Sequence, residues 1–346
     1  MKMMANDVRD DVRIAVIGAG SWGTALAILL AHKGHEVRLW GHRQEHMELL
    51  TRERENRKYL KGIPFPEKLI PVDALEVAIA GTTIILMVVP SHSFRKIFQR
   101  IHPLLKDGMR IVSAVKGIEN VTLKTMTQIV EEIIGKNSAD LRNIKIGVLS
   151  GPSFAEEVAR GVPTAVTLGF GDLHVAKELQ DIMVTDSFRI YTSRDVIGLE
   201  ISAALKNIVA IAAGVCDGLG YGLNTRAALI TRGLAEIKRL GTALGADTDT
   251  FSGLSGLGDL ILTCTGNLSR NRMVGVMLGQ GKSIEQVKSE MKMVAEGIKT
   301  TQSVYDLAKK MNIEMPILEQ IHSILFEGKK CSEAVKDLLQ RELKDE

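Results

Sequence analysis

The feature that constrains this chain most is a short apolar run that leads directly into three closely spaced glycines. Ile14–Ile17 are apolar, Gly18, Gly20 and Gly23 follow in a Gly-x-Gly-x-x-Gly pattern, and an uncharged helical stretch begins at once. In such a strand–turn–helix unit the first glycine permits a tight turn, the second lets the backbone approach a pyrophosphate, and the third allows close helix packing. The free N–H groups of the first helical turn then face the phosphates. The segment therefore predicts a dinucleotide-binding site.

The same stretch is long and apolar enough to resemble a membrane span or a signal peptide. Ile14–Ala31 carries no charge, and its length lies in the range of a membrane helix. Three glycines within its first ten residues would weaken such a helix, and Asp7, Asp10 and Asp11 are the opposite of a basic leader. We therefore expect neither a membrane span nor a signal peptide.

Length and composition are typical of a soluble protein with more than one domain. The 346 residues exceed what one core usually supports, and 45% of them are hydrophobic and 25% charged. The net charge of +3 gives no sign of a nucleic-acid or membrane surface, although it would help to attract a small anion. The three cysteines, Cys216, Cys264 and Cys331, are odd in number and far apart, as expected for reduced thiols in the cytoplasm. Histidines and cysteines show no ligand spacing, so no metal site is predicted.

Strand and helix signals alternate through the first half of the chain. We expect a helix at Thr24–Lys33 and a charged helix at Gln44–Leu60. Strands are expected at Ile14–Ile17, Glu36–Trp40, Thr83–Val89, Arg110–Val115, Asn143–Leu149, Pro163–Leu168 and Ser187–Tyr191. This alternation predicts an α/β fold with a Rossmann-like, doubly wound and mostly parallel sheet.

The pattern changes near residue 195. Ile197–Val215 is helical and apolar nearly all round, which is typical of a helix buried inside a helical domain. Further helices are expected at Thr225–Leu244, Asn271–Leu278, Ser283–Met291, Thr300–Met311, Pro316–Phe326 and Ser332–Leu343, with no convincing strand. The sequence therefore predicts a dinucleotide-binding domain over residues 1–194 and an all-α substrate and catalytic domain over residues 195–346.

Small polar and glycine-rich segments follow several of the predicted strands. These segments are Gly18–Gly23, Val89–Ser91, Lys116–Gly117 and Ser150–Ala155. Because ligands of open parallel sheets bind outside the carboxyl ends of the strands, a phosphate loop, a lysine and polar loops at this edge favour a pocket for an anionic substrate. The alternative is that these residues only form turns and that Lys116 is a solvated loop lysine.

Lys206 is the one charged residue between Glu200 and Asp217, within an otherwise apolar helix. An ammonium buried there is costly unless it is paired or its pKa falls. A lysine with a lowered pKa can donate or accept a proton near neutral pH, as hydride transfer requires at the substrate oxygen. Asn207 beside it would orient a hydroxyl or carbonyl group. The alternative is a lysine at the helix edge whose ammonium reaches water.

A third group of polar residues lies within Gly253–Arg272. Asp259 would hold an ammonium or accept a hydroxyl proton. Arg270 has the planar fork that suits a phosphate, and Ser269 and Asn271 add neutral donors. The alternatives are that Asp259 only caps a helix and that Arg270 is a surface charge.

The turn after the second predicted strand, Leu39–Arg43, contains no carboxylate. Sites for NAD commonly place an Asp or Glu there to hold the ribose hydroxyls. His42 and Arg43 instead favour a ribose that carries a 2′-phosphate. The sequence therefore favours NADP, with NAD as the alternative cofactor.

With these residues in place, the chain strongly resembles the NAD(P)-dependent glycerol-3-phosphate dehydrogenases of the bacterial type, from Val12 to about Leu339. The most specific segments are Gly18–Gly23, Ser113–Gly117, Leu149–Glu157, Ala204–Glu236, Gly256–Thr265 and Ser269–Asn271. This resemblance implies the reversible reduction of dihydroxyacetone phosphate to sn-glycerol 3-phosphate, a precursor of phospholipids. It also implies a Rossmann domain followed by a helical domain.

The resemblance further implies roles for individual residues. Lys206 would be the catalytic acid/base, and Lys116 would contact and orient the substrate. The other substrate positions are Gly151, Ser153, Asp259, Ser269, Arg270 and Asn271. The cofactor positions are Ser21, Trp22, His42, Lys116, Ala155, Arg270, Val294 and Glu296, to which the motif adds Gly18, Gly20 and Gly23 and the charge argument adds Arg43. Family members differ at the His42–Arg43 turn, so the resemblance does not decide between NAD and NADP.

The expected reaction transfers a hydride from NAD(P)H to the C2 carbonyl while Lys206 protonates the oxygen. Lys116 and Asn207 would stabilise that oxygen, and Arg270 would hold the phosphate. Two alternatives stay open: a hydroxyacid or 6-phosphogluconate-type dehydrogenase, which also joins a Rossmann domain to a helical one, and a nucleotide-sensing protein without turnover. A homodimer is one use of the apolar helix faces in the second half, and burial in the core is the other.

Overall fold

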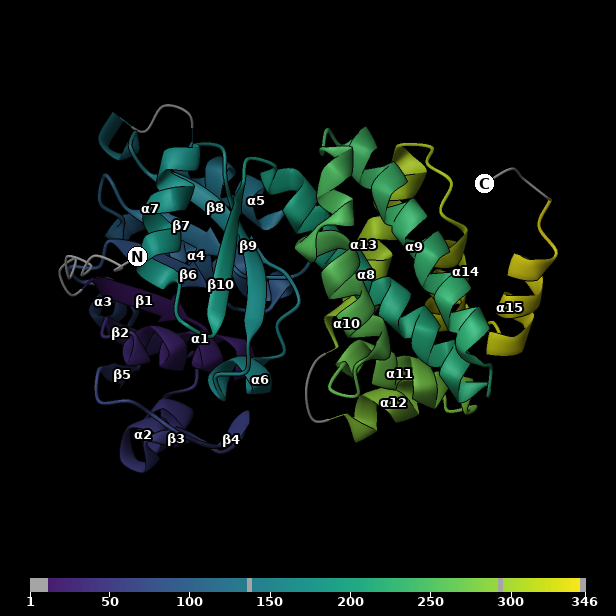
Figure 1. Cartoon of the computed structure of the whole chain (residues 1–346), viewed down its shortest axis with the longest axis horizontal. Helices are drawn as coiled ribbons and strands as arrows, with labels where there is room; N and C mark the ends of the chain where they lie inside the picture. Colours follow the sequence, from purple (N-terminus) through teal and green to yellow (C-terminus); the bar gives the residue numbers. More distant parts are fainter. Residues whose placement is uncertain (1–11, 136–138, 292–294, 343–346) are drawn as a thin grey trace, which may run out of the picture.

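The computed structural model describes residues 12–135, 139–291 and 295–342 and has two lobes side by side (Figure 1). The first lobe holds a β-sheet with its helices, and the described part of the second lobe is helical. Two residues connect the last strand of the sheet, β10 (Phe188–Ser193), to the first helix of the second lobe, α8 (Val196–Gly218). The predicted division after residue 194 falls in this connection, and as a division into separate domains it stays a prediction.

Eight strands form one sheet in the order β10-β9-β8-β7-β6-β1-β2-β5. Besides β10, the strands are β1 (Arg13–Ile17), β2 (Glu36–Trp40), β5 (Leu69–Val72), β6 (Ile84–Met87), β7 (Arg110–Ser113), β8 (Lys145–Ser150) and β9 (Thr164–Phe170). Neighbouring strands are parallel, except that β8 and β9 are antiparallel. From β5 to β8 the arrangement is that of dinucleotide-binding sheets, in which the ligand lies where the strand order reverses beside β1. The predicted doubly wound, mostly parallel sheet is confirmed.

A hydrophobic core lies on each face of this sheet. Along β1, Ile14 and Val16 belong to one core and Ala15 and Ile17 to the other, because successive side chains of a strand point to opposite faces. The helices that cover the two faces are α1 (Ser21–His32), α2 (Gln44–Glu53), α3 (Leu75–Ile79), α4 (Ser91–Ile101), α5 (Met126–Ile134), α6 (Ala155–Ala159) and α7 (Leu173–Met183).

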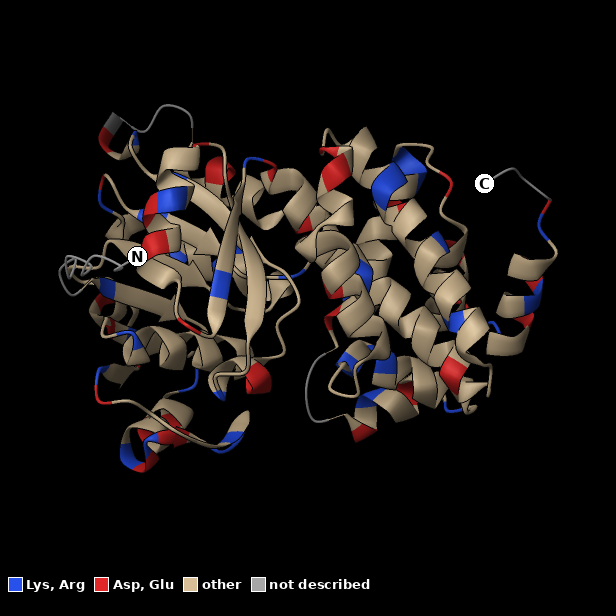
Figure 2. Cartoon of the chain, viewed as in Figure 1, with Lys and Arg blue, Asp and Glu red and all other residues tan. Residues whose placement is uncertain are grey.

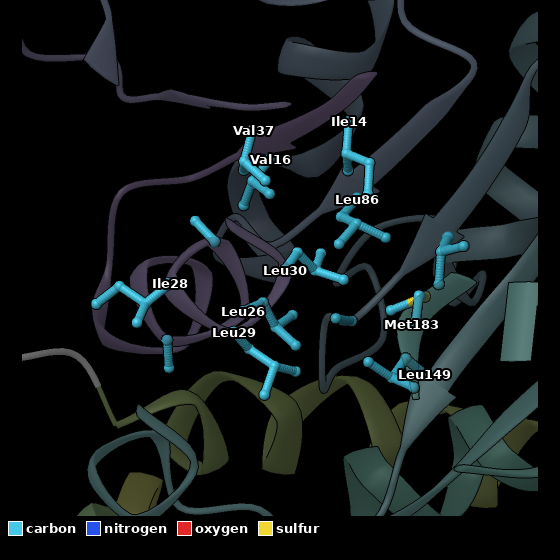
Figure 3. Packing of buried hydrophobic residues seen from close by; sticks show 14 of the residues in the cluster. Ile14, Val16, Leu26, Ile28, Leu29, Leu30, Val37, Leu86, Leu149 and Met183 are labelled. Atoms are coloured by element: carbon cyan, nitrogen blue, oxygen red, sulfur yellow. The ribbon is translucent and has the colours of Figure 1, made fainter. Parts of the chain in front are cut away.

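Helix α1 packs tightly on the centre of the sheet. Its Leu26 and Leu30, four residues apart and therefore on one side of the helix, lie toward Val16 of β1 and Leu86 of β6 (Figure 3). All four side chains are fully buried. Truncation of one such leucine to alanine typically costs about 2–5 kcal/mol, so this contact holds α1 firmly against the central strands of the sheet.

One helix is shorter than the sequence predicts. The stretch Gln44–Leu60 is expected to be a single helix, but α2 ends at Glu53 because Arg54 adopts the left-handed conformation, with φ 52° and ψ 33°. The chain then forms an antiparallel hairpin of β3 (Glu55–Asn56) and β4 (Leu60–Pro64). The prediction is wrong here because contacts of this hairpin with the loop after β1, which helical periodicity does not reveal, decide the conformation.

The second lobe is built around α8. This helix is long and apolar enough to cross a membrane, but 89% of its most apolar 18-residue window is buried inside the protein. The predicted buried helix Ile197–Val215 is therefore confirmed as a core helix. Around it lie α9 (Leu223–Ala243), α10 (Asp259–Thr265), α11 (Arg270–Gly279), α12 (Ile284–Glu290), α13 (Glu296–Lys310), α14 (Pro316–Phe326) and α15 (Cys331–Leu339).

Glycines bring α11 into backbone contact with α8. A Cβ atom at Gly214 of α8 would lie 2.0 Å from the carbonyl oxygen of Arg272, and one at Gly275 of α11 would lie 2.0 Å from that of Ile211. Small residues at a crossing allow two helices to approach this closely. The N-terminus of α11, with the predicted substrate residues, is thereby held against α8.

Charged residues are distributed over both lobes. In Figure 2, acidic and basic residues are interspersed along the ribbon of the sheet lobe and of the helical lobe, and neither lobe is of one sign.

Candidate active site

Lys206 is buried rather than solvated. It lies near the middle of α8 with 5% of its surface exposed. Its ammonium donates hydrogen bonds to Oδ1 of Asp259 at 2.6 Å and to Oγ1 of Thr263 at 2.8 Å. The alternative of an ammonium that reaches water at the helix edge is therefore wrong for this structure.

Asp259 joins two ammonium groups. Its Oδ1 faces Lys206, and its Oδ2 accepts a hydrogen bond of 3.0 Å from Nζ of Lys116. Lys116 lies three residues beyond β7, at the carboxyl edge of the sheet, whereas Asp259 is the first residue of α10. The two alternatives, in which Asp259 is only a helix cap and Lys116 only a solvated loop lysine, therefore do not hold. Asp259 is 1% exposed, and its carboxylate joins Lys116 of the sheet lobe to Lys206 of the helical lobe.

Burial sets the protonation of this cluster. Removal from water lowers the pKa of Lys206 to about 7, because Asp259 only partly offsets the desolvation and the Lys116 charge lowers the pKa further. Burial alone would raise the pKa of Asp259, but the ammonium groups of Lys116 and Lys206 hold it below its ordinary value. Asp259 therefore stays ionised, while Lys206 gains and loses a proton near neutral pH.

Thr263 completes the cluster, although the sequence analysis did not single it out. Its hydroxyl donates to the carbonyl oxygen of Asp259 at 2.6 Å and accepts from Lys206 at 2.8 Å. The signal that was available is spacing, since residues four apart on a helix share one side. Asn207, the next residue of α8, is 4% exposed, and its amide makes no hydrogen bond within the described residues. That amide is free to meet a ligand.

The loop after β8 contributes backbone to the same place. Gly151 has φ 142°, a conformation that favours glycine, and a Cβ there would lie 2.9 Å from Cα of Val166. Its carbonyl oxygen accepts hydrogen bonds from Lys116 at 3.4 Å and from the Ser153 hydroxyl at 3.0 Å. Ala155 opens α6 directly afterwards. Gly151 and Ser153 thus lie next to Lys116, as the resemblance implies.

The N-terminus of α11 carries three further predicted residues. Ser269 caps the helix by accepting from the backbone N–H of Arg272 at 3.2 Å, so its own hydroxyl proton stays free to donate. Oδ1 of the buried Asn271 accepts from the backbone N–H of Gly297 at 3.0 Å, which leaves its NH2 group for a ligand. Arg270 is the exposed first residue of the helix. A helix N-terminus with these donors suits an anion.

The glycine-rich turn has the shape that the motif requires. Gly18 has φ 128°, and a Cβ there would lie 2.4 Å from the carbonyl oxygen of Val88. A Cβ at Gly23 would lie 1.8 Å from the carbonyl oxygen of Gly18, whereas one at Gly20 would meet no atom within 4 Å. Two glycines therefore serve the turn and the packing of α1, and the third leaves its face open. This geometry fits a bound pyrophosphate.

The β3–β4 hairpin folds over this turn. The buried amide of Asn56 donates to the carbonyl oxygen of Ala19 at 3.1 Å and to Oγ1 of Thr24 at 2.8 Å. The Ser21 hydroxyl donates to the carbonyl oxygen of Tyr59 at 2.8 Å. Trp22 in the first turn of α1 has a buried indole N–H without a partner among the described residues, which is consistent with a bound acceptor. Sequence reasoning missed this hairpin and its contacts with the glycine-rich turn.

Basic residues gather near this hairpin. His42 and Arg43 are exposed after β2. Burial, followed by the nearby charge of Lys58 on the hairpin, lowers the pKa of His46 in α2, and Arg43 and His42 add to the effect. Arg43 and Lys58 therefore bring positive charge close to the His46 imidazole, and neither Lys58 nor His46 was among the residues predicted from the sequence.

Glu296 lies at the start of α13 and contacts the sheet lobe. Its carboxylate accepts from the backbone N–H of Ser91, the first residue of α4, at 3.3 Å. Burial raises the pKa of Glu296. Val294, the other cofactor position implied by the resemblance, lies outside the described residues.

A separate hollow of about 830 Å³, which includes Thr127, Arg194 and Asp247, contains none of the predicted site residues.

Comparison with known proteins finds one family over both lobes. The N-terminal model of the NAD-dependent glycerol-3-phosphate dehydrogenase family matches residues 13–176, and the C-terminal model matches residues 195–336. A glycerol-3-phosphate dehydrogenase (NAD(P)+) of Desulfotalea psychrophila is 61% identical over 333 residues, which are 96% of this chain and 98% of the relative. Another from Citrifermentans bemidjiense is 51% identical over 334 residues, again 96% and 98% of the two chains.

Solved structures of the same family resemble this chain closely. The crystal structure of a glycerol-3-phosphate dehydrogenase from Coxiella burnetii superimposes with a TM-score of 0.90 at 42% identity and covers 96% of this chain and 99% of that one. A D-mandelate dehydrogenase superimposes with a TM-score of 0.61 at 16% identity, covering 94% and 99% of the two chains, which shows a shared fold alone.

Proposed function

The chain belongs to the family of NAD(P)-dependent glycerol-3-phosphate dehydrogenases, oxidoreductases that interconvert dihydroxyacetone phosphate and glycerol 3-phosphate, and from this premise we propose that Lys206 carries the proton of that reaction. The observation that carries the proposal is the position of the Lys206 ammonium. It is buried and lies 2.6 Å from the Asp259 carboxylate, which also binds Lys116. No other described lysine combines such burial with a pKa of about 7.

Lys206 serves both directions of the reaction. When bound, the reduced nicotinamide supplies a hydride to the C2 carbonyl carbon of dihydroxyacetone phosphate. The Lys206 ammonium donates a proton to the C2 oxygen, and in the reverse direction the neutral amine accepts the hydroxyl proton. A group with a pKa near 7 does both efficiently at neutral pH. Asp259 and Thr263 hold Nζ in one orientation through their hydrogen bonds.

The surrounding residues bind the rest of the substrate. Lys116 places a second positive charge beside Asp259 and stabilises the C2 oxygen as negative charge develops there. The Asn207 amide donates to the same oxygen. Arg270 holds the phosphate with its planar guanidinium, together with the Ser269 hydroxyl and the Asn271 amide at the N-terminus of α11. Gly151 and Ser153, beside Lys116, complete the substrate positions.

The dinucleotide binds along the turn after β1. The open face at Gly20 and the first N–H groups of α1 meet the pyrophosphate, and Trp22 offers its unpaired indole N–H. Ser21, Ala155, Arg270, Val294 and Glu296 complete the cofactor positions. The resident cofactor is NAD(P), and the turn at His42 and Arg43 favours NADP, because a 2′-phosphate would meet basic groups there and no carboxylate.

Steady-state kinetics test this function. We expect oxidation of NADPH, and more weakly of NADH, with dihydroxyacetone phosphate, followed as a loss of absorbance at 340 nm. Turnover of a 2- or 3-oxo acid panel in preference to dihydroxyacetone phosphate would instead favour a hydroxyacid or 6-phosphogluconate-type dehydrogenase. Cofactor binding in a calorimeter without any absorbance change in the presence of every substrate would favour a nucleotide sensor.

The cellular role and assembly state extend the same proposal. The product would supply glycerol 3-phosphate to phospholipid synthesis in the cytoplasm, where three unpaired cysteines stay reduced. The apolar faces of the second half, on which the homodimer prediction depends, lie largely in the core of the helical lobe. Light scattering of the purified protein decides between monomer and homodimer.

A further inference from the structure

The segment that follows Lys116 passes from the sheet lobe into the helical lobe. Ile118 belongs by sequence to the connection between β7 and α5, yet it is 1% exposed and packs in the hydrophobic core of the helical lobe. Two residues later, Oδ1 of Asn120 accepts a hydrogen bond of 2.8 Å from the hydroxyl of Ser303, a fully buried residue of α13. Ile118 and Asn120 are thus both fixed to the helical lobe.

Glu119, between these two residues, is fixed to the sheet lobe. Arg95 of α4 binds both of its carboxylate oxygens, with Nε–Oε1 and Nη2–Oε2 distances of 2.8 Å. Arg95 also donates to Glu132 of α5 at 2.9 Å. A two-point contact between a guanidinium and a carboxylate fixes orientation as well as distance. Alternate residues of Ile118–Asn120 therefore face opposite lobes, as they do along an extended chain, and the segment forms a bridge.

Gly117, which connects this bridge to Lys116, is tightly packed. A Cβ at Gly117 would lie 2.7 Å from Cβ of Ser91 in α4 and 3.6 Å from Oγ1 of Thr300 in α13. The backbone directly after Lys116 is therefore enclosed between the two lobes. A shift of the bridge must move the backbone that carries the Lys116 side chain.

We propose that Ile118 and Asn120 are positioning residues that hold the Lys116 ammonium at the Asp259 carboxylate. The inference rests on the proposed role of Lys116 at the substrate oxygen. A lysine side chain has four rotatable bonds and a large conformational entropy, so its ammonium stays on one carboxylate only if the backbone beneath it is fixed. The Ser303–Asn120 hydrogen bond and the buried Ile118 supply that fixation from the lobe that contains Asp259.

The experiment compares Asn120→Ala with Asn120→Asp in the full-length enzyme. Asn120→Ala removes the nearest acceptor of the Ser303 hydroxyl and leaves the carbonyl oxygens of Ile118 and Lys299, both at 3.5 Å, whereas Asn120→Asp retains an acceptor at position 120. Loss of one hydrogen bond is worth about 0.5–1.5 kcal/mol, so we expect Asn120→Ala to lower kcat/KM for dihydroxyacetone phosphate roughly three- to tenfold. Asn120→Asp should recover most of the loss. NADPH affinity, measured by fluorescence titration, should not change in either variant.

Val121→Ala provides the matched control. Val121 is the next residue of the same loop and is 91% exposed, so its truncation should leave kcat, KM and Tm at wild-type values. An equal loss in Val121→Ala and Asn120→Ala would mean that the loop responds to any substitution, and would overturn the inference.

A double-mutant cycle separates positioning from a general structural role. If Asn120 acts through Lys116, then Asn120→Ala should have no further effect on the residual rate of Lys116→Met. Additive effects, or wild-type kinetics in Asn120→Ala, would sink the positioning inference while leaving Lys116 in place. Wild-type kcat/KM in Lys116→Met alone would instead contradict the proposed role of Lys116, so the two failures are distinguishable.

Discussion

The Lys206 ammonium and the Asp259 carboxylate lie 2.6 Å apart, with 5% and 1% of their surfaces exposed. A buried ion pair contributes little to stability, since the loss of hydration of both charges offsets their attraction. Here the carboxylate also binds Lys116 at 3.0 Å, so three charges share a site that an apolar cluster would fill at lower cost. This arrangement is better explained by proton transfer and anion binding than by folding.

Removal of the Lys206 amine should lower turnover by orders of magnitude without loss of the fold. Lys206→Met keeps the length of the side chain, and Asp259 retains Lys116 as its partner. Because general acid catalysis contributes about 10²–10⁴-fold, we expect kcat for dihydroxyacetone phosphate reduction to fall by that factor. The dissociation constant of NADPH should change little. Stopped-flow and fluorescence titration give the two quantities.

The control for this variant is Lys309→Met. Lys309 is an exposed lysine of α13 that pairs with Glu319 at 3.0 Å, and surface pairs of this kind contribute at most about 1 kcal/mol. Its loss should leave kcat and KM at wild-type values. Wild-type turnover in Lys206→Met would remove Lys206 as the acid/base.

The two directions of the reaction should respond to pH in opposite ways. Lys206 has a pKa of about 7, and the charged groups that face it are Asp259, Lys116 and Glu296 together with the thiol of Cys264. Reduction needs the ammonium, so its kcat should fall about tenfold per pH unit above pH 7. Oxidation of glycerol 3-phosphate needs the amine and should rise up to pH 7 and then level off.

These profiles are measured at saturating substrate in both directions. Lys206→Met supplies the control, since its residual rates should lose the inflection near pH 7. An inflection that persists in this variant would assign the titration to another group.

The choice of cofactor should depend on the charge after β2. Arg43 is exposed near Lys58 and His42. A 2′-phosphate of the cofactor would be attracted to the Arg43 guanidinium, whereas a glutamate at this position would repel it. We expect Arg43→Glu to raise KM for NADPH by at least about tenfold, from loss of a charge-assisted contact worth about 1.5–3 kcal/mol. KM for NADH should change less than threefold. Initial-rate kinetics with both cofactors measure the ratio.

Lys177→Glu makes the same change of charge on the exposed side of α7. It should leave both KM values unchanged. Equal increases for NADPH and NADH in Arg43→Glu would show that Arg43 does not recognise the 2′-phosphate.

The crossing of α8 and α11 should not tolerate a methyl group. In Gly214→Ala the new Cβ would lie 2.0 Å from the Arg272 carbonyl oxygen, so the helices must separate. Overpacking of this kind costs about 1–3 kcal/mol or more, and we expect a lower Tm in calorimetry. The N-terminus of α11 would move with the helix, so KM for dihydroxyacetone phosphate should also rise.

Gly171→Ala is the matched control, because a Cβ at Gly171 would meet no atom within 4 Å. A smaller backbone entropy in the unfolded chain should keep its stability equal or slightly higher. A Tm in Gly214→Ala equal to that of Gly171→Ala would contradict the close crossing.

Local patterns in the sequence predicted most of the elements and pointed to several residues that the structure brings together. The alternation of apolar runs and helices predicted the parallel sheet, and the three glycines after β1 predicted the turn that the structure has at Gly18 and Gly23. A lone charge in an apolar helix singled out Lys206 as a candidate for a buried ammonium. These features depend on neighbours within one or two turns of chain, so they can be read directly from the sequence.

Contacts between distant residues were decided only by the tertiary structure. The sequence could not choose between a helix cap and an ammonium partner for Asp259, since its partners lie 53 and 143 positions away. It also mistook the hairpin after Arg54 for helix, because Asn56 is fixed by Ala19 and Thr24 rather than by its own neighbours. The physical reason is the same in both cases. Burial and pairing energies act through space, and only the folded chain brings these groups together in a dry site.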